Sequence, residues 1–116
     1  MEILILLQLK HWYVDFVIQS MDEVRSKGKY GDLLGIWHSF KQGIGTSLAF
    51  SVIDVKYAVI VGILDFILHY HIDWTKMNYS NQDINNPKFW CHLGLDQLAH
   101  QLCYIGYVYY FIIEVL

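Results

Sequence analysis

The sequence is poor in the residues that cross-link or interrupt a chain, with 1 proline and 2 cysteines among 116 residues. The proline, Pro87, falls in the longest polar loop. Cys91 and Cys103 are too few and too far apart for a disulfide framework or a thiolate metal site, and we expect them to be small buried apolar residues. The net charge is only −3. A broad basic surface is therefore absent, which argues against nucleic acid as a partner.

Two sequence signatures are also missing. The N-terminal stretch has neither a basic region nor a small-residue cleavage site. A cleaved signal peptide is therefore not indicated, and we expect the first hydrophobic segment to stay in the mature protein. The chain has no G-x-S-x-G motif, which argues against a serine esterase because that enzyme class carries its nucleophile there.

The chain is rich in apolar residues. Hydrophobic residues make up 55% of it, and the mean hydropathy is +0.31, above the usual range of soluble globular proteins. The aromatic share is 16%, with many rings near the ends of hydrophobic segments, where amphipathic rings favour a bilayer interface. We expect one domain, residues 1–116, with lipid as its solvent. An aromatic-rich soluble helical bundle is the alternative.

Four hydrophobic segments predict four helices joined by polar loops. A helix forms hydrogen bonds between its own backbone N–H and C=O groups, which is the condition for crossing lipid. The expected fold is therefore all-α, a four-helix antiparallel transmembrane bundle with a buried His/Asp site. Asp32 is the expected N-cap of the second helix. The segments cover about residues 3–20, 33–50, 52–74 and 88–114, and 21–32 should be a loop or a short interfacial turn.

Basic residues are distributed unevenly among the loops. In an antiparallel bundle the first and third loops share one side, and they hold most of the loop lysines and the arginine, against Lys56 in the second loop. The positive-inside rule places the first and third loops in the cytoplasm and both termini outside. The basic residues of these two loops are Arg25, Lys27, Lys29, Lys76 and Lys88.

Polar residues recur at four-residue steps within the apolar segments. Asp65, His69 and Asp73 lie one helical turn apart, so in a helix they share a face and can close on a common point, which we interpret as a metal. Random placement would give roughly one histidine with an aspartate four residues away, whereas four of the 6 histidines have one. The other two ladders are His11, Asp15 and Gln19, and His92, Asp96 and His100.

Imidazole and carboxylate groups in this number predict a divalent metal site. The ligand types favour zinc, with manganese or iron as alternatives, and helix bundles hold one ion or a pair in this way. The set exceeds the needs of one tetrahedral ion, so some members would bind a second ion or orient the ligands. A buried His–Asp hydrogen-bond network that only fixes helix register is the alternative. The predicted ligands are His11, Asp15, His38, His69, Asp73, Asp96 and His100.

The polar motifs also resemble a known family in their order and spacing. Together they are similar to small polytopic membrane proteins of bacteria and tailed phages, the domain of unknown function 3307, which is itself similar to predicted membrane-bound metal-dependent hydrolases. The resemblance implies a bacterial inner-membrane protein, which a phage could encode, with these seven residues as functional groups and Gln19 and Gln97 in support. The motifs are H-x3-D-F-x2-Q from His11, Lys27 downstream, the lone His38, H-x3-D from His69, and L-G-x-D-Q-x2-H from Leu93.

We therefore expect an integral membrane, metal-dependent hydrolase that acts on a lipid-like or phosphoester substrate. Asp73 or Asp96 would be the catalytic general base, and Lys27 or Lys76 would meet the substrate headgroup. The alternative is a non-enzymatic membrane protein, either a phage accessory factor acting on the host envelope or a metal or proton conductor that uses the His/Asp column. Membrane lipid is the expected partner, and the chain could also form a homo-oligomer.

Overall fold

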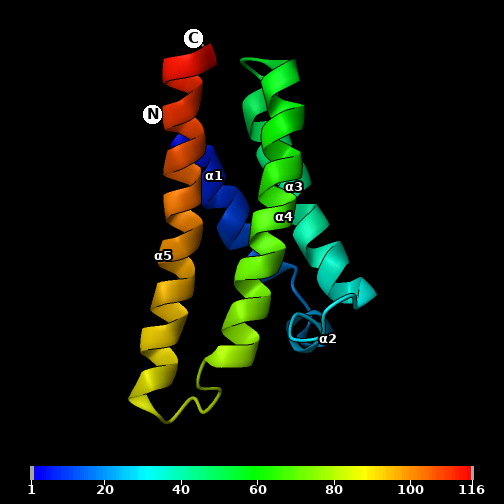
Figure 1. The fold of residues 1–116 in the computed structure, drawn as a ribbon, viewed down its shortest axis with the longest axis vertical. Helices are drawn as coiled ribbons and strands as arrows, with labels where there is room; N and C mark the ends of the chain where they lie inside the picture. Colours follow the sequence, from blue (N-terminus) through cyan, green and yellow to red (C-terminus); the bar gives the residue numbers. More distant parts are fainter. Residues whose placement is uncertain (1, 116) are drawn as a thin grey trace.

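The computed structural model describes residues 2–115, and all regular structure within that range is helical (Figure 1). This confirms the all-α prediction. Two π-helical turns, η1 and η2, continue α1 and α5. The elements are α1 (Glu2–Trp12), η1 (Tyr13–Val17), α2 (Met21–Ser26), α3 (Leu33–Ser51), α4 (Val55–Tyr79), α5 (Pro87–Tyr110) and η2 (Phe111–Val115).

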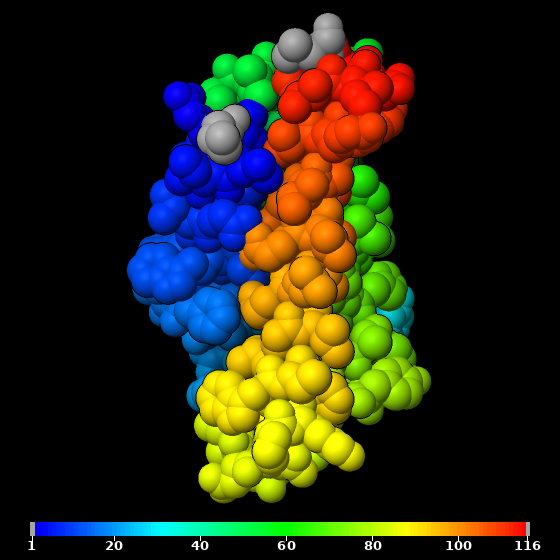
Figure 2. Space-filling model, turned by 90° about the vertical axis from the view of Figure 1, so that its left-hand side faces the viewer, coloured from blue at the N-terminus to red at the C-terminus, as the bar shows by residue number. Residues whose placement is uncertain are grey.

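The long helices alternate in direction and pack into a bundle of 45 × 28 × 22 Å. Figure 1 shows both chain ends beside the loop between α3 and α4, while α2 and the loop between α4 and α5 lie at the opposite end. The first and third loops thus share an end, as predicted. Figure 2 shows α1, in blue, packed along α5, in orange.

Side-chain caps begin the long helices. Asp32 starts α3 as predicted, since its carboxylate accepts a hydrogen bond of 3.0 Å from the backbone N of Leu34. Asp54 and Asn86 cap α4 and α5 in the same way, and Pro87 stands in the first turn of α5. These caps satisfy backbone N–H groups that have no partner within the helix.

The stretch 21–32 contains a helix where we expected only a loop or turn. A capping box starts α2: the backbone N of Glu23 donates to Ser20 Oγ (3.2 Å), and the Glu23 carboxylate accepts from the backbone N of Ser20 (2.9 Å). Burial raises the pKa of Glu23, but the hydrogen bonds from Lys41 and from the Ser20 backbone outweigh it, so the pKa lies below its ordinary value. The S-x-x-E pattern that predicts this turn is present in the sequence.

The interior is mainly polar and the surface mainly apolar. Among residues 2–115, buried hydrophobic side chains such as Leu7, Phe50 and Tyr104 gather at the end that holds the termini. Elsewhere most buried side chains are histidine, aspartate, glutamine, threonine or lysine, and large apolar side chains are exposed on every long helix. Soluble proteins rarely bury charged groups in this proportion, whereas helices surrounded by lipid turn their ionisable residues inward.

One helix of the described chain, α4, is long and apolar enough to cross a membrane. The core helix of a soluble protein can pass the same test, so length and composition alone do not place α4 in a bilayer. The number of membrane-spanning helices therefore stays a prediction, while the helical bundle itself is established.

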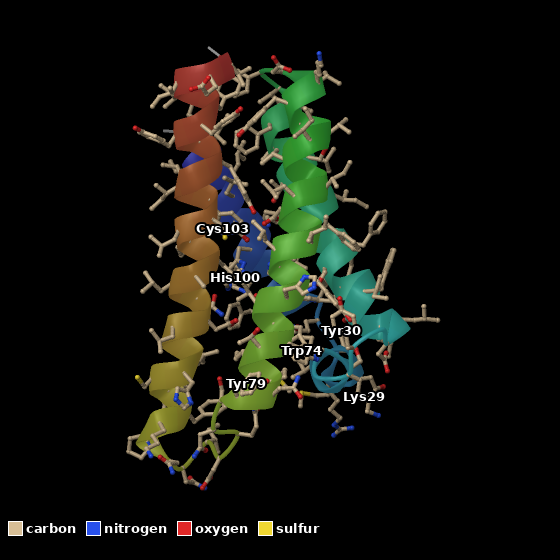
Figure 3. All side chains as sticks on the ribbon, viewed as in Figure 1. Lys29, Tyr30, Trp74, Tyr79, His100 and Cys103 are labelled. Carbon is tan, nitrogen blue, oxygen red and sulfur yellow. The ribbon has the colours of Figure 1, made fainter. Side chains whose placement is uncertain are left out.

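The two cysteines are less buried than expected. Both are free, Cys91 is exposed near the start of α5, and Cys103 is half-buried. Figure 3 shows Cys103 at the seam between α5 and α4. The prediction of two buried residues was wrong because much of the α5 surface is left uncovered by other helices.

Glycines set the distance between α3 and α4. A Cβ on Gly43 would lie 2.7 Å from the backbone oxygen of Gly62 and 2.9 Å from Phe66 Cβ. Because the first of these contacts is backbone, a larger side chain fits only if one helix moves. The small residues of α3 therefore permit close helix approach.

Replacing Gly43 should test this packing. Gly43→Ala should lower the free energy of unfolding by about 1–3 kcal/mol because α4 must shift. Gly94→Ala is the matched control, since nothing lies within 4 Å of its Cβ position, and helix propensity alone should raise stability by up to about 1 kcal/mol. Thermal unfolding followed by circular dichroism measures both, and an unchanged Gly43→Ala would contradict the close approach.

Candidate metal centre

The bundle interior brings together the seven predicted ligands, which come from four long helices and one π-helical turn. Figure 3 shows one of them, His100, between α5 and α4. Each of the seven is buried, with at most 7% of its surface exposed. They are His11 on α1, Asp15 in η1, His38 on α3, His69 and Asp73 on α4, and Asp96 and His100 on α5.

Two histidines and two aspartates alternate around one small space. His38 Nε2 lies 2.8 Å from Asp15 Oδ1 and 3.6 Å from Asp73 Oδ2. His69 Nε2 lies 3.7 Å from Asp15 Oδ1 and 3.1 Å from Asp73 Oδ2, the same two oxygen atoms. Neighbouring ligand atoms on a tetrahedral ion held at about 2.1 Å are about 3.4 Å apart. The four contacts bracket this spacing, and Asp15, His38 and His69 offer atoms that all lie within 4.8 Å of one another, as ligands of one cation would.

Hydrogen bonds do not explain this arrangement. Within residues 2–115, the Nδ1 atoms of His38 and His69 have no hydrogen-bond partner, and their Nε2 atoms make only the ion-pair contacts with Asp15 and Asp73 given above. Buried polar atoms are nearly always paired, and leaving one unpaired costs about 1–3 kcal/mol. A network that only fixed helix register would be expected to satisfy the two Nδ1 atoms as well. The buried groups could instead hold a metal ion.

A π-helical turn positions Asp15. The turn interrupts the α-helical hydrogen bonding of α1 at this residue, and such turns are rare and often found at functional sites. Gln42 Nε2 donates to Asp15 Oδ1 over 2.8 Å, and Gln19 Nε2 donates to the backbone oxygen of Asp15 over 2.7 Å. Gln19 thus supports the backbone that carries the carboxylate.

His100 and Asp96 extend the site toward α5. His100 Nε2 lies 3.3 Å from Asp73 Oδ1 and 3.4 Å from Asp96 Oδ1. Two groups of potential ligand atoms result, each with its atoms within 4.8 Å of one another: Asp15, His38 and His69, and His69, Asp73 and His100. Since His69 belongs to both, the donors fit either one ion with outer support or two neighbouring ions.

His11 lies beside this site with both ring nitrogens occupied. Its Nε2 is 2.6 Å from Gln97 Oε1, and its Nδ1 is 2.9 Å from Tyr104 Oη. Because an amide oxygen only accepts, Nε2 is the donor, and Nδ1 accepts from the tyrosine. His11 Nε2 also lies 3.3 Å from Asp15 Oδ2. In this arrangement His11 supports Asp15 and has no free nitrogen for an ion.

Two lysines partly neutralise the carboxylates. Lys27 Nζ is 3.4 Å from Asp73 Oδ2, and this lysine side chain is only 4% exposed. Lys76 Nζ is 3.6 Å from Asp96 Oδ2 and is more accessible, with its side chain 19% exposed. Three carboxylates, those of Asp15, Asp73 and Asp96, thus face two ammonium groups. With the histidines neutral, one negative charge is left. This excess of negative charge would favour a bound cation, because uncompensated buried charge is costly.

Asp65 does not join the site, contrary to the expectation that it would converge with His69 and Asp73. Its carboxylate pairs with Lys10 at 3.3 Å and accepts a hydrogen bond of 3.0 Å from Tyr107. Lys10 supplies the opposite charge from α1, so Asp65 forms a separate ion pair nearer the termini.

Two other histidines also lie outside the site. His92 Nδ1 accepts a hydrogen bond of 2.9 Å from the backbone N of Asn81, so this member of the last ladder holds the loop before α5. His71 is exposed, and its Nε2 lies 3.1 Å from Tyr30 Oη.

Sequence reasoning missed two residues of the site: Gln42, which contacts Asp15, and Tyr104, which contacts His11. The signal was available: Gln42 follows His38 by four residues, and Tyr104 follows His100 by four. Counting only histidine–aspartate pairs at four-residue steps hid these neutral partners on the same helix faces.

Residues 3–115 match the family described as Protein of unknown function (DUF3307). The chain belongs to this family. The match confirms the membership expected from the polar motifs, while the family's membrane location, its occurrence in phages and its likeness to hydrolases stay predictions. No curated protein and no solved structure matches the chain.

His69→Ala should release the metal, because His69 contributes to both groups of donors. We expect elemental analysis of the purified protein to find a divalent metal, and we expect the variant to bind it about tenfold more weakly or worse. His71→Ala is the matched control, since this exposed histidine is on the same helix and should leave metal content unchanged. Equal metal content in all three proteins would contradict the site.

Proposed function

We propose that this protein is an integral membrane protein that binds a divalent metal ion and hydrolyses an ester or phosphoester bond in a lipid-like substrate. The observation that carries the proposal is the buried cluster of His38, His69, Asp15 and Asp73, whose neighbouring atoms lie 2.8–3.7 Å apart, while the Nδ1 atoms of both imidazoles lack hydrogen-bond partners among residues 2–115. A mixed imidazole and carboxylate set suits zinc, with manganese or iron as alternatives.

The distribution of apolar surface supports the membrane location. Exposed leucine, isoleucine and aromatic side chains cover the long helices, while the charged groups of the site are inside. The helices α3, α4 and α5 have 19, 25 and 24 residues, which at a rise of 1.5 Å per residue span about 28–38 Å. A hydrocarbon core is about 30 Å thick. The end with α2 and the third loop, rich in lysine, would face the cytoplasm.

A hollow between α4 and α5 supports access for a substrate. Its volume is about 270 Å³, and Lys76 and Asp96 are among the residues that line it. Asp96 also belongs to the site, since its Oδ1 is 3.4 Å from His100 Nε2. That oxygen has no hydrogen-bond partner among the described residues. Asp96 is therefore the residue at which a substrate in the hollow would meet the metal centre.

The chemistry follows from these positions. A bound divalent ion lowers the pKa of a coordinated water toward neutrality. Asp96 accepts a proton at Oδ1 as general base, and Lys76 pairs with the negative charge of the headgroup. Asp73 is surrounded by histidines and Lys27, so we assign it the role of a metal ligand. Asp96 is then the general base.

A conductor of metal ions or protons is the second candidate, and a separate observation favours it. A chain of buried polar contacts leads away from Asp15: Gln42 donates to Asp15 over 2.8 Å and accepts from Lys10 over 2.7 Å, and Lys10 pairs with Asp65. Ion flux into liposomes without hydrolysis of any ester would select this function. We favour the hydrolase over the conductor because Asp96 lines the hollow between α4 and α5.

Asp96→Asn should separate binding from catalysis. The variant should keep its metal but hydrolyse bis-p-nitrophenyl phosphate or p-nitrophenyl esters about 10²–10⁴-fold more slowly, since a general base contributes that much. Asp73→Asn should lose both metal and activity, whereas Asp83→Asn, in the exposed third loop, should lose neither. Full activity of Asp96→Asn, or activity that survives metal chelation, would overturn the mechanism.

A further inference from the structure

The seam between α4 and α5 holds a second hollow beyond the one at Lys76. Its volume is about 440 Å³, and it is lined by Ile60, Leu64, Cys103 and Gly106 among others. Figure 3 shows Cys103, His100 and Tyr79 one after another along this seam. Cys103 lines the second hollow and Tyr79 the first, so the metal centre lies between the two.

The two hollows lie on the same face of each helix. On α5, Asp96 of the first hollow and Tyr107 of the second are eleven residues apart, and on α4 so are Ile72 and Val61. Eleven residues make three full turns of an α-helix, with a rise of about 16 Å. The two hollows therefore follow one another along the α4–α5 seam, at a separation comparable to an extended dodecyl chain, and together they are called the groove here.

The ends of the groove differ in polarity. The first hollow has the Lys76 ammonium and the His92 ring. Because His92 Nδ1 accepts from the Asn81 backbone, the neutral ring carries its proton on Nε2, which is a further donor. An ammonium and an N–H donor suit the oxygens of a phosphate.

The second hollow is apolar in character. Two tyrosine hydroxyls at its wall are already used within the protein: Tyr57 donates to the backbone oxygen of Tyr107, and Tyr107 donates to Asp65. The aliphatic residues Ile60 and Leu64 are 56% and 44% exposed. The groove is thus open at its side, so that an alkyl chain could enter laterally from a surrounding membrane.

We propose that the substrate is a single-chain amphiphile with a phosphate headgroup. Its headgroup lies between Lys76 and the metal centre, and its chain extends past Cys103 toward Tyr110. This assignment rests on the proposed function, because it names the substrate class of the same site. Hydrolysis adds water across the P–O bond and yields the long-chain alcohol and inorganic phosphate, with the proton accepted by Asp96 passed to the leaving oxygen.

Protection of Cys103 from alkylation tests the groove. The full chain in phosphatidylcholine nanodiscs is treated with a maleimide, with and without dodecyl phosphate, and labelling of each cysteine is followed by mass spectrometry. Dodecyl phosphate should slow the labelling of Cys103 at least severalfold and leave that of Cys91 unchanged. Inorganic phosphate should have no effect, and dodecanol should need a much higher concentration. No selective protection, or equal protection by dodecanol, would overturn the proposal.

Variants of the groove sharpen the test. Gly106→Leu fills the second hollow without a clash, since nothing lies within 4 Å of its Cβ position, and dodecyl phosphate should no longer change the labelling rate. Gly94→Leu is the matched control: its Cβ position is equally open, it lies on the opposite face of α5, and protection should persist. The Lys76→Gln variant should require about tenfold more dodecyl phosphate for the same protection of Cys103. Unchanged protection in Gly106→Leu would contradict the groove.

The readout separates this proposal from the proposed function. If the protein holds metal and hydrolyses a soluble phosphoester but dodecyl phosphate does not protect Cys103, the substrate class is wrong and the hydrolase stands. If dodecyl phosphate protects Cys103 but the protein hydrolyses neither it nor other esters, the groove stands as a lipid site and the hydrolase is wrong.

Discussion

The structure depends on the meeting of imidazole and carboxylate groups in the buried interior of the bundle. His38, His69, Asp15 and Asp73 face one another at 2.8–3.7 Å, and unpaired groups of this kind are costly to bury. Each helix must therefore present one polar face to the common centre. The close approach of α3 and α4 at Gly43 brings candidate ligands from both helices close together.

This polar interior also accounts for the outer surface. Once the histidines, aspartates and lysines are inside, leucines, isoleucines and aromatic rings are left to face the surroundings. Such an arrangement is favourable where the solvent is lipid. The proposed membrane location, the candidate metal centre and the proposed lateral access along the α4–α5 seam thus all rest on one distribution of residues.

Much of this could be predicted from the sequence, because a four-residue step places side chains on one helix face whatever the tertiary structure. The ladders identified the faces that meet, and Asp32 identified the start of α3. What the ladders could not predict was partner choice, which depends on the rotation of each helix about its axis. Asp65 therefore pairs with Lys10, and His11 with Gln97 and Tyr104. The π-helical turn at Asp15 likewise has no local sequence signal.

The central claim is that a cation binds between imidazole and carboxylate groups from separate helices, and X-ray absorption spectroscopy of the purified, zinc-loaded protein tests it most directly. The account predicts a first shell of nitrogen and oxygen atoms at about 2.0–2.2 Å, with the outer-shell scattering of at least two imidazole rings. A spectrum of zinc surrounded by water alone, or by sulfur from the cysteines, would contradict it.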